Sequence, residues 1–181
     1  MVYLFLAEGF EEIEALTPVD ILRRGKVNLK TVGVTGKNVT GSHGITVTAD
    51  MTIDELDDLS DAQAVILPGG MPGTLNLEAD KRVISAIKYC VENNRFVAAI
   101  CAAPSILGHL GVLDGKRATA FPGFEKDLIG AEFYNDFVAH DGNIITAKGM
   151  GVSVEFGLEI LAAIKDTETA NNVRSAIQCK P

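Results

Sequence analysis

Phe96-Val-Ala-Ala-Ile100-Cys101-Ala-Ala-Pro104 is the stretch that decides the fold. Its first five residues are continuously apolar, which is typical of a strand buried on both faces of a parallel sheet. Pro104 suits the first turn of a helix, where its missing N–H costs nothing. Strand, cysteine and helix follow one another without a linker. We therefore expect Cys101 to lie in a sharp strand-to-helix turn.

The segments on either side repeat this alternation of short apolar runs and helical patterns. Val2–Leu6 and Leu29–Val34 read as strands, and the pattern from about Glu11 to Arg24 between them predicts a helix. Strands and helices that alternate with short connections predict an α/β fold, a doubly wound parallel sheet with helices on both faces. Further strands are expected at 64–67 and 96–100, helices at about 80–93, 104–110, 153–164 and 167–177, and hairpins within 36–50 and 137–146.

Length and composition indicate an ordinary globular protein. The 181 residues fit one domain over 1–181, with 47% apolar residues, 22% charged residues and a net charge of −8. Lysine and arginine do not cluster, which argues against nucleic acid or an anionic membrane surface as a partner. The first residues lack a basic start and a long apolar run, so we expect a cytoplasmic protein with no membrane span.

The three cysteines have neither disulfide nor metal-ligand spacing, and we expect no metal or other cofactor. Cys90 shares an apolar helical stripe and is expected in the core, whereas Cys179 lies in the C-terminal tail. Cys101 directly follows a strand, where ligands bind in such sheets. Free N–H groups at the following helix would stabilise its thiolate and lower the thiol pKa. The alternative is a small buried apolar side chain.

Several acids lie at the start of the first predicted helix. The helix dipole explains Glu11 and Glu12. Glu14 differs because Thr17 and Ile21 lie at i+3 and i+7 from it, on a face that is not clearly exposed. Desolvation there would raise the pKa of Glu14, and the protonated carboxyl could donate a hydrogen bond to a neighbouring thiolate. The alternative is that Glu14, like Glu11 and Glu12, only interacts favourably with the helix dipole.

The run Leu67-Pro68-Gly69-Gly70 ends another predicted strand. Its amides could hold an oxyanion, although glycine and proline also dominate plain turns. A nucleotide-binding loop is disfavoured because neither glycine-rich phosphate motif occurs. Among the histidines, His43 in the hairpin of 36–50 is a possible contributor to the site, whereas His109 falls within a helix and is expected to be structural.

Together these residues resemble a known family. The matching stretches are Glu8-Gly-Phe-Glu-Glu-Ile-Glu14, Pro18-Val-Asp20, Leu67-Pro-Gly-Gly70, Ala98-Ala-Ile-Cys101-Ala-Ala-Pro104 and Lys148-Gly-Met-Gly151. They are similar to the DJ-1/ThiJ/PfpI superfamily, specifically its DJ-1 branch, over essentially the whole chain. The combination is specific, whereas each motif alone would be weak.

The resemblance implies a flavodoxin-like fold, a homodimer and a cysteine on a nucleophile elbow. Cys101 matches the reactive cysteine and Glu14 the carboxylic acid that hydrogen-bonds its sulfur. Gly69 and Gly70 match the loop whose amides face the sulfur, with the Ala102 amide as a further backbone donor.

Members of this branch are described as stress-response proteins, chaperones, deglycases and glutathione-independent glyoxalases acting on 2-oxoaldehydes such as methylglyoxal. The resemblance thus implies a cofactor-independent enzyme for a small carbonyl substrate. Thiolates add readily to carbonyls, and a carboxyl of raised pKa can move protons. The alternative is a redox sensor or chaperone that uses oxidation of Cys101.

Two departures bear on mechanism. Thr119-Ala-Phe121-Pro122 places Phe121, a possible accessory residue, where the family often has histidine. Ala102 follows the cysteine where the peptidase-like branch has histidine, which disfavours a peptidase. An amidotransferase is also disfavoured, because His140-Asp-Gly142 is a poor match to the His-x-Glu pair it would need.

Overall fold

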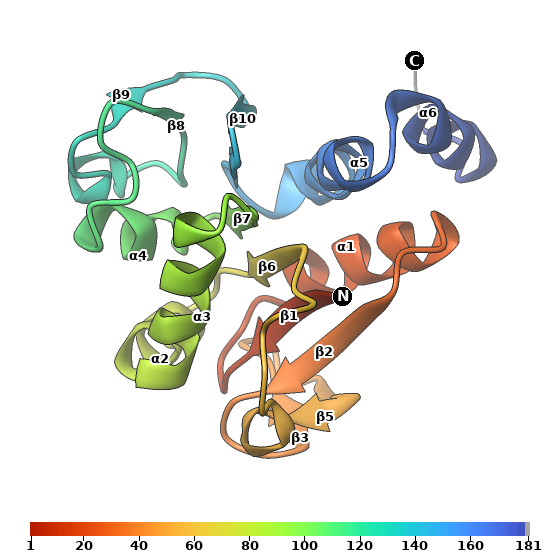
Figure 1. The fold of residues 1–181 in the computed structure, drawn as a ribbon, viewed down its shortest axis with the longest axis vertical. Coiled ribbons are helices and arrows are strands. Elements are labelled where there is room, and N and C mark those ends of the chain that lie inside the picture. The colour runs from red at the N-terminus through yellow and green to blue at the C-terminus, as the bar shows by residue number, and fades with distance from the viewer. Residues whose placement is uncertain (180–181) are drawn as a thin grey trace.

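A central sheet of seven strands organises the chain in the computed structural model, which describes residues 1–179 (Figure 1). The spatial order is β10-β11-β7-β6-β1-β2-β5, and every neighbouring pair is parallel except β10 with β11. The strands are β1 (Val2–Leu6), β2 (Leu29–Gly33), β5 (Met51–Thr52), β6 (Ala64–Leu67), β7 (Phe96–Ile100), β10 (Val138–Asp141) and β11 (Ile144–Ala147).

Helices cover both faces of this sheet, as Figure 1 shows. Side chains of β1 alternate between two buried clusters: Leu4 and Leu6 face one, and Tyr3 and Phe5 face the other. The first cluster contains residues of α1 (Glu12–Arg24), α5 (Ser153–Ile164) and α6 (Thr167–Ala176). The second contains residues of α2 (Gly73–Ala79), α3 (Lys81–Glu92) and α4 (Pro104–His109). The predicted doubly wound α/β fold is confirmed.

The strand order explains where a ligand can bind. Numbered along the chain, the five central parallel strands β2-β1-β6-β7-β11 have the order 2-1-3-4-5, which is the flavodoxin-like order. The chain reverses direction across the sheet between β1 and β6. Loops leave a crevice at such a switch point, outside the carboxyl ends of the strands. The segments after β1, β6 and β7 meet there.

The smaller elements agree with the sequence only in part. The predicted hairpins form from β3 (Asn38–Thr40) with β4 (Thr46–Thr48) and from β10 with β11. Helix α2 was not predicted, because Pro72 and Gly73 at its start are typical turn residues. Other short elements are the 3₁₀ turns η1 (Ile53–Glu55), η2 (Glu125–Asp127) and η3 (Met150–Val152), and the pair β8 (Arg117–Ala118) with β9 (Glu132–Phe133).

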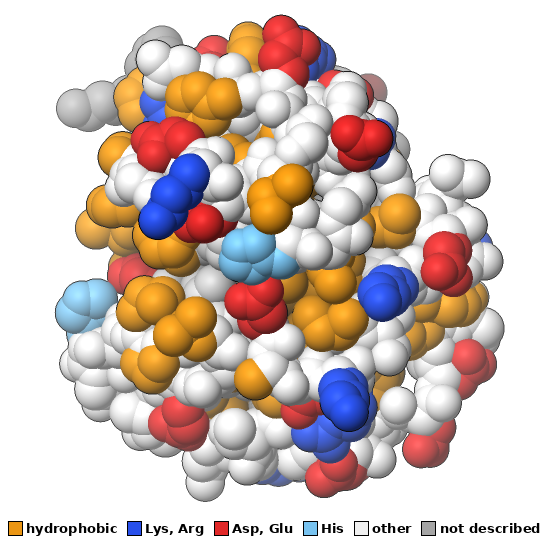
Figure 2. Space-filling model, turned by 90° about the vertical axis from the view of Figure 1, so that its left-hand side faces the viewer, with side chains coloured by type: hydrophobic (Ala, Val, Ile, Leu, Met, Phe, Trp, Pro, Cys, Tyr) orange, Lys and Arg blue, Asp and Glu red, His pale blue; other side chains and the backbone are white. Residues whose placement is uncertain are grey.

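The surface is mixed in character. Figure 2 views the side on which α2, α4 and β9 lie in Figure 1, and its basic side chains are few and interspersed with acidic and apolar ones. The described residues form no continuous basic area on that face. Within residues 1–179, no helix is long and apolar enough to cross a membrane.

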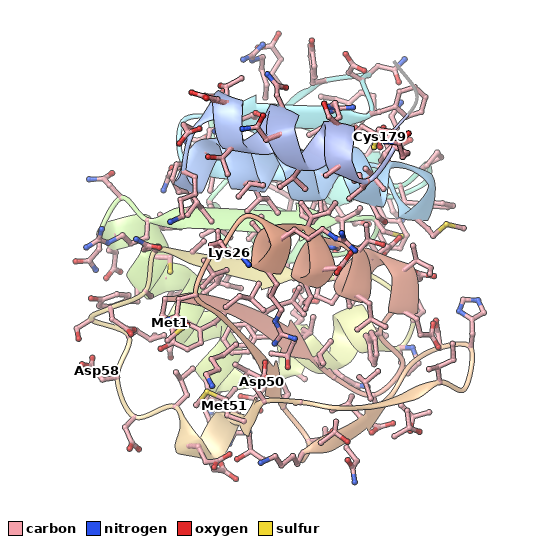
Figure 3. The ribbon with its side chains drawn as sticks, turned by 90° about the vertical axis from the view of Figure 1, so that its right-hand side faces the viewer. Met1, Lys26, Asp50, Met51, Asp58 and Cys179 are labelled. Carbon is pink, nitrogen blue, oxygen red and sulfur yellow. The ribbon has the colours of Figure 1, made fainter. Side chains whose placement is uncertain are left out.

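Two cysteines lie in the fold's apolar layers. Cys90 is fully buried in α3, as predicted, and burial raises its pKa to about 11. Cys179, expected in the C-terminal tail, donates its N–H to Arg174 O, and its side chain packs against the cluster of α1, α5 and α6. Figure 3 shows Cys179 beside α5 and α6, at the opposite end of the view from Asp58.

Candidate active site

Cys101 lies on the turn between β7 and α4, with φ at +66°. Non-glycine residues rarely adopt this left-handed conformation, and it persists only where the surroundings enforce it. Here two backbone hydrogen bonds do so: Cys101 N–H donates to Ala147 O, and Phe121 N–H donates to Cys101 O, both at 2.9 Å. The predicted elbow is therefore present, and its half-buried thiol lies at the carboxyl end of β7.

The sulfur of Cys101 receives hydrogen bonds from the amides of Ala102 and Gly70. Helix α4 has only six residues, so these direct donors matter more than the helix dipole on which the sequence argument relied. Gly70 has φ of +90°, and a side chain there would collide with the backbone of Glu11 and Gly9. Glycine is thus required for the loop to bring its amide to the sulfur.

Glu14 comes to the same point from the first turn of α1 and is only 1% exposed. Glu11 caps that helix, accepting from Glu14 N–H at 2.7 Å. The Glu14 carboxyl is hydrogen-bonded to the Cys101 side chain and accepts from the backbone amides of Gly69, at 3.0 Å, and of Met150. Among the described residues, the Glu14 carboxyl included, no buried side-chain nitrogen or oxygen lacks a hydrogen-bond partner.

The role expected for Gly69 needs correction. Its amide faces the Glu14 carboxylate rather than the sulfur, so Gly70 and Ala102 remain as the sulfur's backbone donors. A Cβ at position 69 would lie 2.6 Å from the Cys101 Cβ and 2.7 Å from Glu14 Oε2. Gly69 is therefore the spacer that lets the acid and the thiol approach each other.

The pKa of Glu14 is raised, as expected from the sequence, whereas the pKa of Cys101 is not lowered as expected. Burial raises the pKa of Glu14 to about 7, although its hydrogen bonds with Cys101 and Gly69 oppose the rise. Burial, and then the charge of Glu14, raise the pKa of Cys101 to about 12. The predicted lowering of the Cys101 pKa is thus wrong beside an ionised Glu14, because two adjacent negative charges repel in a desolvated site.

The two groups titrate as a pair, so one proton is shared between them from about pH 7 to about pH 12. When that proton lies on Glu14, the sulfur is a thiolate that accepts from the carboxyl and from the amides of Gly70 and Ala102. When it lies on the sulfur, the carboxylate keeps the amides of Gly69 and Met150. The geometry thus permits proton transfer between acid and thiol.

His43 does not join this pair. Its side chain is 70% exposed, and its Nδ1 lies 2.8 Å from Oε2 of Glu12. The Glu12 carboxylate also accepts from the amides of His43 and Ile45. Burial opposes ionisation of Glu12, but these hydrogen bonds outweigh it and lower its pKa. Glu12, which the sequence assigned only to the helix dipole, therefore fixes the β3–β4 hairpin to α1.

Among residues 1–179, one group has side chains close enough to share a metal ion: Glu11, Glu12 and His43, whose ligating atoms lie within 4.8 Å of one another. Both oxygens of Glu12 already accept hydrogen bonds from the hairpin. The arrangement is explained as an attachment of the hairpin and does not require an ion.

Phe121 lies where a groove adjoins the site. The groove has a volume of about 350 Å³ and is lined by Phe121, Pro122, Phe137, Lys148, Gly149, Met150, Gly151 and Val152. A Cβ placed on Gly149 would be 3.2 Å from the Phe121 ring and 3.7 Å from Glu14 Oε1, so Gly149 lies between groove and acid. Sequence reasoning missed this groove, because its residues come from segments whose approach no local pattern shows.

A model of the DJ-1/PfpI family matches residues 1–163 of the chain. The chain belongs to the DJ-1/PfpI family. Among curated proteins it is 34% identical over 180 residues to protein DJ-1 homolog A of Arabidopsis thaliana, covering 97% of this chain and 46% of that one. It is 32% identical over 181 residues to the Parkinson disease protein 7 homolog of Danio rerio, covering 98% and 96%.

Solved structures of DJ-1 proteins have the same fold. Oxidized DJ-1 of Toxoplasma gondii superposes with a TM-score of 0.93 at 28% identity, covering 97% of this chain and 96% of that one. DJ-1beta of Drosophila melanogaster gives a TM-score of 0.92 at 28% identity, covering 99% and 98%. The flavodoxin-like arrangement expected of a DJ-1/PfpI protein is therefore present.

The raised pKa of Glu14 predicts a pH-dependent stability. Between its usual value of 4.5 and about 7, the folded protein holds a proton that the unfolded chain releases. This stabilisation is complete below about pH 4.5 and is lost as the pH rises through 7. Urea unfolding at several pH values should show it, and Glu14→Gln should lack this component, about 3 kcal/mol at ~1.4 kcal/mol per pKa unit. Parallel pH profiles for the two proteins would contradict the assignment.

Proposed function

We propose that this DJ-1/PfpI protein is a cofactor-independent glyoxalase that converts 2-oxoaldehydes such as methylglyoxal into 2-hydroxy acids. The observation that carries the proposal is the hydrogen-bonded pair of Cys101 and Glu14, with the amides of Gly70 and Ala102 on the sulfur. Such a pair supplies a nucleophile for the aldehyde and an acid–base group for the carbon-bound protons.

The reaction needs three steps. The Cys101 thiolate adds to the aldehyde carbon, and the carbonyl oxygen takes up a proton, giving a hemithioacetal. The Glu14 carboxylate removes the proton from that carbon and returns one to the neighbouring carbon, which leaves a hydroxyacyl thioester. Water then hydrolyses the thioester, releasing the hydroxy acid and restoring the thiol. The sum is oxoaldehyde plus water to hydroxy acid, with no oxidant required.

Glu14 is assigned the proton transfers because the histidines are engaged elsewhere. Nδ1 of His109 lies 2.6 Å from Glu78 Oε1, and Nδ1 of His140 lies 2.7 Å from Glu159 Oε1. His43 is paired with Glu12 on the hairpin. Deglycase activity, the hydrolysis of adducts that the same aldehydes form, would use the same thiol and the same acid.

Methylglyoxal consumption by purified protein tests this proposal. Cys101→Ser and Glu14→Gln are each expected to lower kcat/KM by about 100-fold or more, because positioned acid–base catalysis alone contributes ~10²–10⁴-fold. Cys179→Ser is the matched control, since it removes another thiol without touching the pair. Equal rates in all four proteins would refute the proposal.

A redox role for the same sulfur is the second candidate. Peroxide oxidises a thiolate to a sulfenate and then to a sulfinate, and one peroxide molecule is reduced to water for each oxygen added. A protonated Glu14 beside the sulfur could donate a hydrogen bond to a sulfinate oxygen. One similar structure, the Toxoplasma gondii DJ-1, is itself described as oxidized. A sensor or chaperone function would begin with this oxidation.

Mass spectrometry after mild peroxide treatment separates this candidate from general thiol oxidation. Cys101 should gain oxygen first, because it is half-buried beside a proton acceptor, whereas Cys90 is fully buried. Earlier oxidation of Cys90 or Cys179 would remove the basis of the redox role.

The proposal includes a homodimer. Ile13 and Leu16 on α1 are 46% and 37% exposed, and Ile45 on the attached hairpin is 54% exposed. Glu12 joins the two elements through the Ile45 amide, so these apolar side chains belong to connected surfaces. Exposed apolar patches mark interaction sites, and most homo-oligomers are twofold dimers.

Sedimentation of the native protein should therefore give a dimer mass. Ile13→Lys should shift it toward the monomer, because a charge would be buried in the contact. Ile129→Lys, a change at another exposed isoleucine, should leave the mass unchanged. A monomeric native protein at tens of micromolar would contradict this part of the proposal.

A further inference from the structure

The apolar groove beside the catalytic pair has no task in the mechanism above. Its walls are the rings of Phe121 and Phe137 together with Met150 and Val152. Phe121, Phe137 and Met150 are 48%, 61% and 53% exposed, an unusual concentration of large apolar side chains at one place. Exposing these side chains to water is unfavourable, so a bound molecule that covers them would be stabilised.

Two backbone hydrogen bonds connect residues that line the groove to the catalytic pair. The Phe121 amide donates to the carbonyl of Cys101, and the Met150 amide donates to Glu14. Gly149 lies between the groove and the acid, since a Cβ built on it would be 3.2 Å from the Phe121 ring and 3.7 Å from Glu14 Oε1. The groove therefore adjoins the place where a molecule bonded to the Cys101 sulfur would lie.

One charged side chain lines the groove, and it is held in place. Lys148 Nζ donates to Asn135 Oδ1 at 2.8 Å and lies 5.2 Å from the centre of the Phe137 ring. The remaining lining residues of the groove are apolar or glycine. Its volume of about 350 Å³ is ample for an aromatic ring, since an apolar cavity of roughly 150 Å³ binds benzene.

We infer that this groove binds the apolar side group of the substrate, so that the protein prefers 2-oxoaldehydes with an aryl or larger alkyl group over methylglyoxal. The inference rests on the proposed function and adds a specificity subsite to it. Phe121 and Phe137 are the specificity-determining residues. Phenylglyoxal represents the preferred class, and mandelate is its hydroxy acid product, as lactate is that of methylglyoxal.

Kinetics give the first test. The native ratio of kcat/KM for phenylglyoxal to that for methylglyoxal should exceed ~10, since hydrophobic pockets discriminate by ~10–200-fold for a single methylene group. Phe121→Ala and Phe137→Ala should each lower this ratio about tenfold. Phe133→Ala, an exposed phenylalanine on β9 outside the groove, should not. An unchanged ratio in both groove variants would overturn the inference.

Calorimetry gives a second test that does not need turnover. Mandelate should bind the native protein at least about tenfold more tightly than lactate, and Phe121→Ala should remove the difference. Equal affinities would overturn the subsite even if methylglyoxal is consumed. Tighter mandelate binding without consumption of either aldehyde would support the subsite and refute the glyoxalase. A groove variant that turns a dimer into a monomer at unchanged ratio would assign the groove to the subunit contact instead.

Discussion

The buried carboxyl of Glu14 is the interaction on which the geometry of the site depends. It accepts hydrogen bonds from the amides of Gly69 and Met150, and it is hydrogen-bonded to the side chain of Cys101. These partners come from the loops after β6 and β11 and from the elbow after β7, whereas Glu14 itself lies on α1. One side chain thus joins four segments that are distant in the sequence. A buried carboxyl without such partners would be strongly destabilising, so the loops and the acid stabilise one another's positions.

This convergence follows from topology. The chain reverses direction across the sheet between β1 and β6, so the loops after these strands diverge and leave space over the strand ends. Two backbone hydrogen bonds join the loops after β1 and β6: Glu11 N–H donates to Gly69 O, and Gly73 N–H donates to Gly9 O. Gly9 and Gly70 both have positive φ and leave no room for a side chain at these close contacts. These two glycines therefore let the loops after β1 and β6 pack closely together, whereas Gly69 lets the acid approach the thiol.

The sheet, the helices on both of its faces and the elbow could be predicted from the sequence, because continuous apolar runs and helical spacing are local patterns. It also paired Glu14 with Cys101 through the family motifs. It could not show that Gly69 donates to the acid and Gly70 to the sulfur, since that depends on the direction of single peptide groups. The attachment of the hairpin by Glu12 and the Phe121 groove were missed for a different reason. Each arises where distant segments meet, and neither has a signature within one segment.

The absence of a histidine from the pair has a further electrostatic consequence. A thiolate beside an imidazolium forms a neutral couple, whereas a thiolate beside a carboxylic acid carries one net negative charge. The charge stays in a half-buried site of a chain whose net charge is −8, and the amides of Gly70 and Ala102 are the dipoles that compensate it. Such a site binds any anion less tightly than an uncharged molecule of the same shape, because the anion is desolvated and unpaired on entering it. Uncharged carbonyl compounds avoid this penalty, and the apolar wall of Phe121 favours them further. The charge of the acid–thiol pair and the composition of its groove thus both favour the kind of molecule that we propose as substrate, a neutral aldehyde with an apolar side group.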